Sequence, residues 1–143
     1  MSFEVRSEVW IDAPVETVWE VLTDTASYPD WNPLVRRFDG PLEVGAVVRA
    51  TFEPFPGRRL RNKVAVTAVS PPHRVAWAGR MGADRLLRGE HVYELGSHDG
   101  GTQLANFEVF DGWLLPVARL VLERTRAGYD RNSEAIKVRA EAR

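Results

Sequence analysis

The sequence predicts an α+β fold in which an antiparallel sheet of seven strands packs against one long C-terminal helix. Three patterns support this prediction. Strand-like alternation opens the chain at Phe3–Ile11, short strands and turns fill residues 34–111, and helical periodicity runs from Trp113 to Arg143. A sheet with an apolar face and a helix with an apolar stripe can bury these surfaces together, so we expect the sheet to curl around the helix.

The N-terminal segment predicts one strand and two short helices. In Phe3–Ile11, apolar residues alternate with charged ones, which is the period of a half-buried strand. Asp12–Pro14 begins the first helix, because Asp can cap a helix and Pro fits its first turn. Apolar residues then recur at helical spacing through Leu22. Asp24 begins a second short helix, which ends within Tyr28–Pro33 because two prolines cannot continue it.

The middle of the chain predicts six further strands, separated by turns rich in Gly, Pro, Ser and Asp. Successive short strands joined by tight turns favour an antiparallel meander. One of these turns is expected at Gly82–Asp84. The expected strands are Val35–Phe38, Ala46–Glu53, Arg59–Val69, Arg74–Met81, Leu86–Leu95 and Thr102–Phe110.

The last thirty residues predict one long helix, since they contain no proline after Pro116. Its opposite side is rich in Arg and Glu, which predicts a solvated face. Gly128 costs ~1 kcal/mol relative to Ala in a helix, so we expect a bend or a close contact there. The residues of its mostly apolar stripe are Leu115, Ala118, Leu122, Thr125, Tyr129, Asn132 and Ile136.

Composition indicates a single globular domain over residues 1–143. The hydrophobic fraction is 44% and the charged fraction 27%, which suits a chain with its own core. The formal net charge is −1, and such neutrality predicts no attraction to nucleic acid or to an anionic membrane. The absence of cysteine excludes disulfides, thiolate catalysis and Cys-based metal sites.

No targeting or cofactor signal is present in the sequence. The first residues carry charges at Glu4, Arg6 and Glu8, and no stretch approaches ~20 apolar residues, so we expect a cytoplasmic protein. His73, His91 and His98 lack metal-ligand spacing, and there is no phosphate-binding loop or dinucleotide fingerprint. We therefore expect no metal and no cofactor.

Several short motifs follow one another along essentially the whole chain and together resemble the SRPBCC (START-like) superfamily, in particular its polyketide cyclase/dehydrase-like branch. The resemblance implies a helix-grip fold with a hydrophobic cavity between sheet and helix. It implies no single activity, because the superfamily includes cyclases, lipid carriers, hormone receptors and chaperone co-activators. The motifs are Ile11-Asp12-Ala13-Pro14 before Val18-Trp19, Tyr28-Pro29-Asp30-Trp31-Asn32-Pro33, Pro71-Pro72-His73-Arg74-Val75-Ala76-Trp77, Gly89-Glu90-His91-Val92-Tyr93 and Phe110-x-Gly112-x-x-x-Pro116.

A strand register follows from the last predicted hairpin. If Ser97 and Thr102 flank a four-residue loop, each residue of one strand has a defined partner on the other. The less charged face of Leu86–Leu95 should then point inward, and the preceding hairpin adds a residue from the neighbouring strand. The predicted pairs are Leu95 with Leu104, Tyr93 with Asn106, His91 with Glu108, Gly89 with Phe110 and Trp77 with His91.

The inward residues form a polar cluster with catalytic potential. His91 is a candidate general acid or base, with Glu108 fixing its tautomer and raising its pKa. Tyr93 and Asn106 are candidate hydrogen-bond donors to a ligand carbonyl or hydroxyl. The alternative is that His91 and Glu108 form a cross-strand pair on a solvated face. The strand Thr102–Phe110 alone leaves this open, because its two sides are similarly apolar.

The candidate catalytic residues are His91 and Glu108. The Trp31 region can form a cavity lip or pack against the sheet, and both interpretations stay open. The arginines near Arg58–Lys63 and Arg36-Arg37 fit a solvated strand face better than a nucleic-acid site. The candidate ligand-binding residues are Trp31, Trp77, His91, Tyr93, Asn106, Glu108, Phe110, Leu122 and Tyr129.

Three functional hypotheses follow, and the first is favoured because no complete catalytic constellation is visible. The first is binding of a hydrophobic small molecule, lipid-like or polyketide-like, between the sheet and the C-terminal helix. The second is a cyclase, aromatase or dehydratase acting through His91. The third is a protein-interaction module of the chaperone co-activator type. The expected partner is a hydrophobic ligand, without nucleic acid or stable membrane insertion, on a monomer or homodimer.

Overall fold

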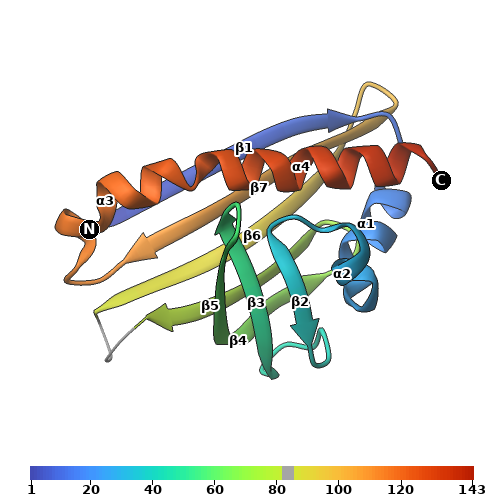
Figure 1. The fold of residues 1–143 in the computed structure, drawn as a ribbon. Coiled ribbons are helices and arrows are strands. Elements are labelled where there is room, and N and C mark those ends of the chain that lie inside the picture. Colours follow the sequence, from blue (N-terminus) through green and yellow to red (C-terminus); the bar gives the residue numbers. More distant parts are fainter. Residues whose placement is uncertain (82–85) are drawn as a thin grey trace.

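The computed structural model describes residues 1–81 and 86–143, in which seven strands form one antiparallel sheet (Figure 1). The spatial order of the strands is β1-β7-β6-β5-β4-β3-β2, so the meander β2 to β7 is closed by β1 at the far edge. The turn expected at Gly82–Asp84 lies outside the described residues. The strands are β1 (Ser2–Ile11), β2 (Val35–Asp39), β3 (Val47–Phe55), β4 (Arg58–Ser70), β5 (Arg74–Met81), β6 (Leu87–His98) and β7 (Gly101–Asp111).

The helices cover one face and one end of this sheet. The short helices α1 (Val15–Thr23) and α2 (Tyr28–Trp31), with the 3₁₀ turn η1 (Thr25–Ser27) between them, gather at one end (Figure 1). Helices α3 (Leu115–Arg124) and α4 (Arg126–Glu141) run in succession across the sheet, which curves around them. This is the α+β helix-grip arrangement that the sequence predicts.

The register predicted for β6 and β7 is confirmed. His91 pairs with Glu108 and Tyr93 with Asn106, while Trp77 of β5 pairs with His91. The connecting turn is tighter than expected, because the strands continue to His98 and Gly101. Asp99 and Gly100 have φ angles of 50° and 79°, the positive values that a two-residue hairpin turn requires.

The C-terminal helix is interrupted, and the break lies at Thr125 rather than at Gly128. Both the backbone N–H and the hydroxyl of Thr125 donate to the carbonyl of Leu122, at 3.0 and 2.6 Å. Such local bonding competes with the regular helical pattern. Gly128 makes the close contact instead, since a Cβ built there would lie 2.8 Å from the carbonyl oxygen of Pro54 on β3.

Helix α3 differs from the expected pattern in a second respect. Its inner stripe is buried as predicted through Leu115 and Leu122, but its outer side is also apolar. Val117 and Leu120 are both more than three-quarters exposed there. The Arg- and Glu-rich outer face that the sequence predicts therefore belongs to α4 and to the end of α3.

Candidate functional site

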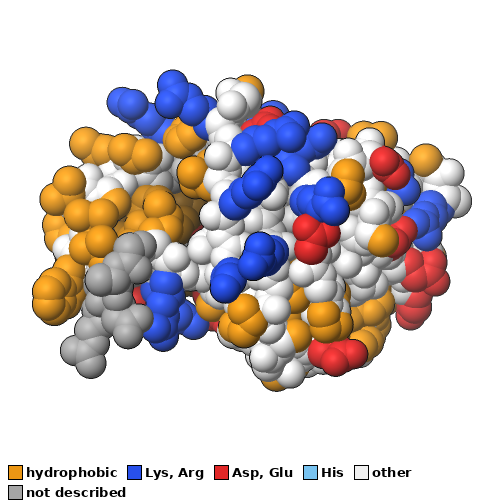
Figure 2. Space-filling view, turned by 60° about the horizontal axis from the view of Figure 1, so that its bottom comes forward, with side chains coloured by type: hydrophobic (Ala, Val, Ile, Leu, Met, Phe, Trp, Pro, Cys, Tyr) orange, Lys and Arg blue, Asp and Glu red, His pale blue; other side chains and the backbone are white. Residues whose placement is uncertain are grey.

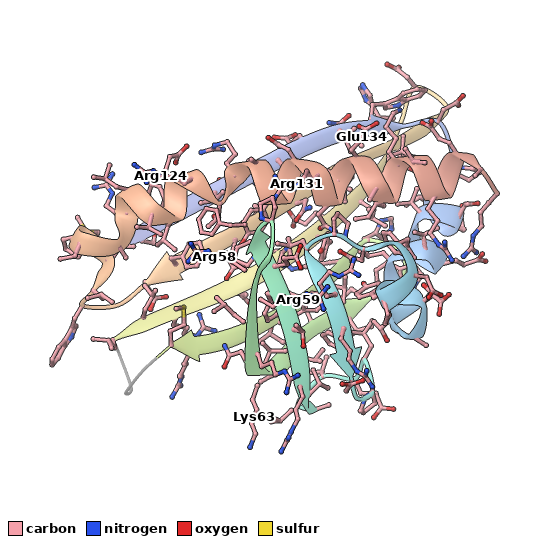
Figure 3. The ribbon with its side chains drawn as sticks, viewed as in Figure 1. Arg58, Arg59, Lys63, Arg124, Arg131 and Glu134 are labelled. Atoms are coloured by element: carbon pink, nitrogen blue, oxygen red, sulfur yellow. The ribbon has the colours of Figure 1, made fainter. Side chains whose placement is uncertain are left out.

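A cavity of about 430 Å³ separates the sheet from the two C-terminal helices. Strands β3 to β7 provide its floor and sides, and α3 and α4 provide its roof (Figure 3). Most of the side chains that face it are apolar, while His91, Glu108 and Tyr129 place polar groups on one wall. The lining residues are Leu34, Phe52, Pro54, Phe55, Leu60, Arg61, Asn62, Val64, Trp77, Gly79, Arg80, Met81, Leu87, Gly89, His91, Glu108, Phe110, Val121, Leu122, Thr125 and Tyr129.

His91 is buried and surrounded by aromatic rings. The ring centroids of Trp77, Tyr93 and Tyr129 lie 5.4, 4.4 and 5.2 Å from that of the imidazole. Its Nε2 lies 2.7 Å from Oδ1 of Asn106. Burial, opposed by this hydrogen bond, lowers the pKa of His91 to about 4. The imidazole is therefore neutral at physiological pH.

A chain of three asparagines fixes the tautomer of this neutral imidazole. Oδ1 of Asn32 accepts the backbone N–H groups of Leu34 and Val35, so it must be the oxygen. It also accepts a hydrogen bond from Nδ2 of Asn132 at 3.0 Å. Oδ1 of Asn132 is then the atom that accepts a hydrogen bond from Nδ2 of Asn106, at 2.9 Å.

The remaining amide oxygen of this chain, Oδ1 of Asn106, faces His91. His91 must therefore donate through Nε2, and its Nδ1 is the ring atom with a free lone pair. The orientation of a ring in the sheet is thus set by backbone groups of the loop that follows α2.

Glu108 and Tyr129 form the second polar element of the wall. The Tyr129 hydroxyl donates to Oε1 of Glu108 at 2.5 Å. Burial raises the pKa of Glu108 to about 7, although the bond from Tyr129 acts in the opposite direction. Gly89 makes room for this carboxylate, since a Cβ there would lie 2.2 Å from Oε2 of Glu108.

One prediction about this pair is wrong. The sequence suggested that Glu108 holds His91 and raises its pKa, because the two residues are paired across β6 and β7. The structure bonds His91 to Asn106 and Glu108 to Tyr129, and burial lowers the pKa of His91. A cross-strand pairing fixes the Cα positions, but the helix above determines which polar partner each side chain meets.

The predicted ligand-binding residues divide into three groups by position. Tyr93 and Asn106 lie behind the cavity wall, where they bond to Asn132. Trp31 packs away from the cavity, edge-on against Tyr28, and its indole Nε1 donates to Ser27. The residues that line the cavity are Trp77, His91, Glu108, Phe110, Leu122 and Tyr129.

The sequence pattern did not predict the polar residues that support the wall from behind. Asn132 and Ser133 on α4, and Asn32 after α2, are buried, and Ser133 bonds to Ser7 of β1 at 2.9 Å. A signal was present, because Asn132 interrupts an apolar stripe and Ser7 interrupts an alternating strand. Polar residues at core positions need hydrogen-bond partners, so they tend to mark such networks.

Trp77 carries a buried polar atom without a partner. Its side chain is fully buried, and its Nε1 has no hydrogen-bond partner among the described residues. An unsatisfied buried donor costs about 1–3 kcal/mol. Elsewhere in residues 1–81 and 86–143, no three His, Asp or Glu side chains gather as a metal site would require. None of the described helices is long and apolar enough to cross a membrane.

A sheet curved around a C-terminal helix pair, with a cavity between them, defines the protein as a member of the START-like (SRPBCC) superfamily. Within it, the chain belongs to the family described as polyketide cyclase/dehydrase and lipid transport, whose model matches residues 2–141. A search of curated proteins gives no match.

Solved structures share the fold at low sequence identity. A START superfamily protein from Mycobacterium smegmatis matches with a TM-score of 0.75 and 19% identity over 97% of both chains. Norcoclaurine synthase of Thalictrum flavum, solved with a transition-state analogue, matches with a TM-score of 0.75 and 14% sequence identity. The match covers 98% of this chain and 94% of that one. The di-domain ARO/CYC protein BexL matches with a TM-score of 0.71 and 18% sequence identity. The match covers 99% of this chain and 49% of the BexL chain.

Proposed function

We propose that this protein binds a hydrophobic small molecule, lipid-like or polyketide-like, in the cavity between the sheet and helices α3 and α4. The cavity itself is the main support. Its volume of about 430 Å³ falls within the ~300–1,000 Å³ typical of small-molecule sites. A mostly apolar wall with a few convergent polar groups is also typical of such sites.

The polar groups of the wall indicate what the ligand carries. Glu108 has a pKa of about 7 and faces the cavity, so a ligand anion placed beside it would be repelled once the carboxyl ionises. The hydroxyl of Tyr129 lies beside Glu108, and the carboxyl of Glu108 can donate to a ligand oxygen while it is protonated. These groups favour a neutral molecule with a carbonyl, hydroxyl or phenol group on an apolar body.

A second candidate function is a cyclase, aromatase or dehydratase, and one observation favours it. A carboxyl group with a pKa of about 7 can donate and accept a proton near neutral pH. The ARO/CYC and norcoclaurine synthase structures show that relatives of this fold are named for enzymatic reactions. The third hypothesis, an interaction module, requires no cavity and gains no support from this one.

Ligand binding is tested by a cavity-filling substitution with a matched surface control. Leu122→Trp places an indole in the cavity, whereas Val138→Trp places one on the exposed side of α4. We expect the wild type and Val138→Trp to show a rise in melting temperature with members of a panel of fatty alcohols and neutral aromatic polyketides. Leu122→Trp should lose that rise.

Native mass spectrometry of the purified protein gives an independent readout, because a tightly held compound should co-purify with it. The absence of any bound compound, together with no thermal shift in the wild type, would contradict the proposal. The enzyme alternative predicts instead that Glu108→Gln keeps the thermal shift but loses turnover of a bound polyketide substrate.

A further inference from the structure

One end of the molecule exposes an unusually apolar surface. Trp113, Val117 and Leu120 are 78%, 77% and 79% exposed, and Leu114 and Val121 are also exposed. All five belong to α3 or to the turn before it. Because residues at i, i+3 and i+4 share a helix face, Val117, Leu120 and Val121 form one outward stripe. Helix α3 is therefore apolar on both its buried and its exposed sides.

This exposed stripe is continuous with the entrance of the cavity. Val121 of α3, Leu60 of β4 and Met81 of β5 line the cavity and are also among the exposed hydrophobic residues. Figure 2 shows hydrophobic side chains gathered at this end of the molecule around a hollow. We call this surface the mouth surface; it consists of Leu60, Met81, Trp113, Leu114, Val117, Leu120 and Val121.

Arginines adjoin the mouth surface. Arg119 and Arg124 lie on α3, Arg61 lines the cavity, and Arg58 lies at the hairpin between β3 and β4 (Figure 3). Within the described part of the chain, none of these four has a carboxylate partner within 4.0 Å. Their positive charge therefore remains available to an external anionic partner.

Charge is distributed unevenly along the chain. Residues 1–34 contain seven acidic and one basic residue, whereas residues 35–90 contain eleven basic and five acidic ones. Figure 2 shows Lys and Arg beside the apolar end and most of the visible Asp and Glu toward the opposite end. The overall charge of −1 thus conceals local concentrations of charge, and basic side chains lie beside the cavity entrance.

We propose that the mouth surface docks this protein on an anionic lipid bilayer, with Trp113, Val117 and Leu120 inserted at the level of the headgroups. Trp, Leu and Val beside arginines are the composition of helices that lie in a membrane interface. Arginines near an anionic leaflet add attraction that falls with salt. The apolar side chains project outward, and a fluid bilayer accepts such projections, whereas a protein partner needs matching hollows.

Docking in this orientation places the cavity entrance against the lipid. A hydrophobic ligand then passes between bilayer and cavity without crossing water, which would cost it the free energy of hydrating its apolar surface. This consequence rests on the proposed function, but the docking itself does not. Docking is peripheral and needs no membrane-spanning segment.

Vesicle co-sedimentation tests the docking directly. We expect the wild type to bind vesicles of phosphatidylcholine with phosphatidylserine, to bind pure phosphatidylcholine less, and to be released by high salt. The double variant Trp113→Ser/Leu120→Ser should bind at least about tenfold more weakly, and Arg58→Ala/Arg124→Ala about fivefold or more for each arginine removed. The matched controls Val138→Ser and Arg143→Ala, both far from the mouth surface in sequence, should bind like the wild type.

Tryptophan fluorescence reports the depth of insertion. Brominated lipids should quench the wild type more strongly than Trp113→Phe. Failure of the wild type to bind anionic vesicles, or equal binding by all the variants, overturns the proposal. Self-association that Trp113→Ser/Leu120→Ser abolishes, without vesicle binding, also overturns it and assigns the surface to a second copy of the chain.

A solution probe separates this inference from the proposed function. Fluorescence of N-phenyl-1-naphthylamine, an uncharged probe, reports the cavity in the absence of vesicles, and Leu122→Trp should reduce it. Probe binding without vesicle binding rejects only the docking. Vesicle binding without probe or panel binding supports docking and rejects the proposed ligand function.

Discussion

At the scale of single residues, the cavity wall contains two titratable groups whose pKa values move in opposite directions. Burial lowers the pKa of His91 from 6.5 to about 4 and raises that of Glu108 from 4.5 to about 7. Both shifts keep the group uncharged, because an unpaired charge inside the protein loses its hydration. The wall is therefore polar but mostly neutral below pH 7.

The first prediction concerns the titration of His91. Because its Nε2 is bonded to Asn106 and its ring is buried, we expect the imidazole to stay neutral from pH 8 down to about 5. Its NMR signals should report the Nε2–H tautomer throughout this range. Protonation of His91 near pH 6.5 would contradict the buried geometry.

The second prediction uses the opposite linkage of the two groups to stability. The unfolded state protonates His91 more readily, so its contribution to stability is lost as the pH falls from about 6.5 to about 4. The unfolded state ionises Glu108 more readily, so its contribution is lost as the pH rises from about 4.5 to about 7. The two slopes cancel in part between these limits.

Single substitutions should expose each slope. Glu108→Gln should leave a protein that loses stability as the pH falls below about 6.5, because only His91 then contributes. His91→Gln should leave one that loses stability as the pH rises from about 4.5 to about 7, because only Glu108 then contributes. Each effect is on the order of 3 kcal/mol, measured by urea unfolding at several pH values. Glu134→Gln on the exposed side of α4 is the control and should keep the wild-type profile. Parallel profiles for all four proteins would count against these pKa shifts.

The third prediction concerns Asn132, the centre of the asparagine chain. Its amide bonds to Tyr93, Asn106 and Asn32, so Asn132→Ala leaves several buried polar groups without partners. We expect a loss of about 2–4 kcal/mol in unfolding free energy. Asp130→Ala, on the exposed side of the same helix, should cost less than about 0.5 kcal/mol. Similar losses for both variants would show that the network contributes little.

At the scale of elements, the cavity depends on how closely α4 approaches the sheet. Gly128 contacts the backbone of Pro54 on β3, and Thr125 ends α3 three residues earlier. The close approach fixes the first turn of α4 against the β3–β4 hairpin. The break lets α3 take its own direction over the cavity, so the two residues together set the height of the roof.

The fourth prediction tests this contact with Gly128→Ala. Alanine favours a helix by ~1 kcal/mol over glycine, so propensity alone predicts stabilisation. The Cβ would however lie 2.8 Å from a backbone carbonyl that cannot rotate away, so we expect a net loss of about 1–3 kcal/mol. Thermal unfolding measures it, with exposed Ala127→Gly as a reference for propensity alone. A more stable Gly128→Ala protein would show that α4 can move off β3 without cost.

At the scale of the whole molecule, the distribution of charge carries information that the total hides. The neutral sum predicted no attraction to an anionic membrane, whereas the fold places several arginines beside the cavity entrance. Attraction depends on the local potential within a Debye length of ~10 Å at ordinary salt, not on the sum over the chain. The neutral total therefore does not argue against docking.

The fifth prediction follows from this distribution. At pH 7.5 and low salt, above the sequence pI of about 6.3, we expect the protein to be retained on a sulfonate cation exchanger despite its slight negative charge. Arg58→Ala/Arg124→Ala should elute at clearly lower salt, and Arg143→Ala should elute almost like the wild type. Passage of the wild type through the column without retention would show that the arginines beside the cavity entrance are too few to hold an anionic surface.

The sequence predicted the strands, the β6–β7 register and the buried stripe of the C-terminal helices because these depend on local periodicity. Alternation of apolar and charged residues identified β1. The length of the loop between β6 and β7 predicted the pairing of His91 with Glu108. Six of the nine ligand-binding candidates line the cavity, although their role in binding stays a prediction. Trp31 was ambiguous, because an aromatic residue beside prolines suits both a cavity lip and a packed corner.

The sequence by itself determined the order of the elements and which face of each is apolar, because neighbouring residues along the chain set those properties. Only the tertiary structure decided the partners of His91 and Glu108, the break at Thr125 and the union of an apolar stripe with arginines at the cavity entrance. Each of these joins side chains from distant segments, and their contacts depend on how the curved sheet meets its helices.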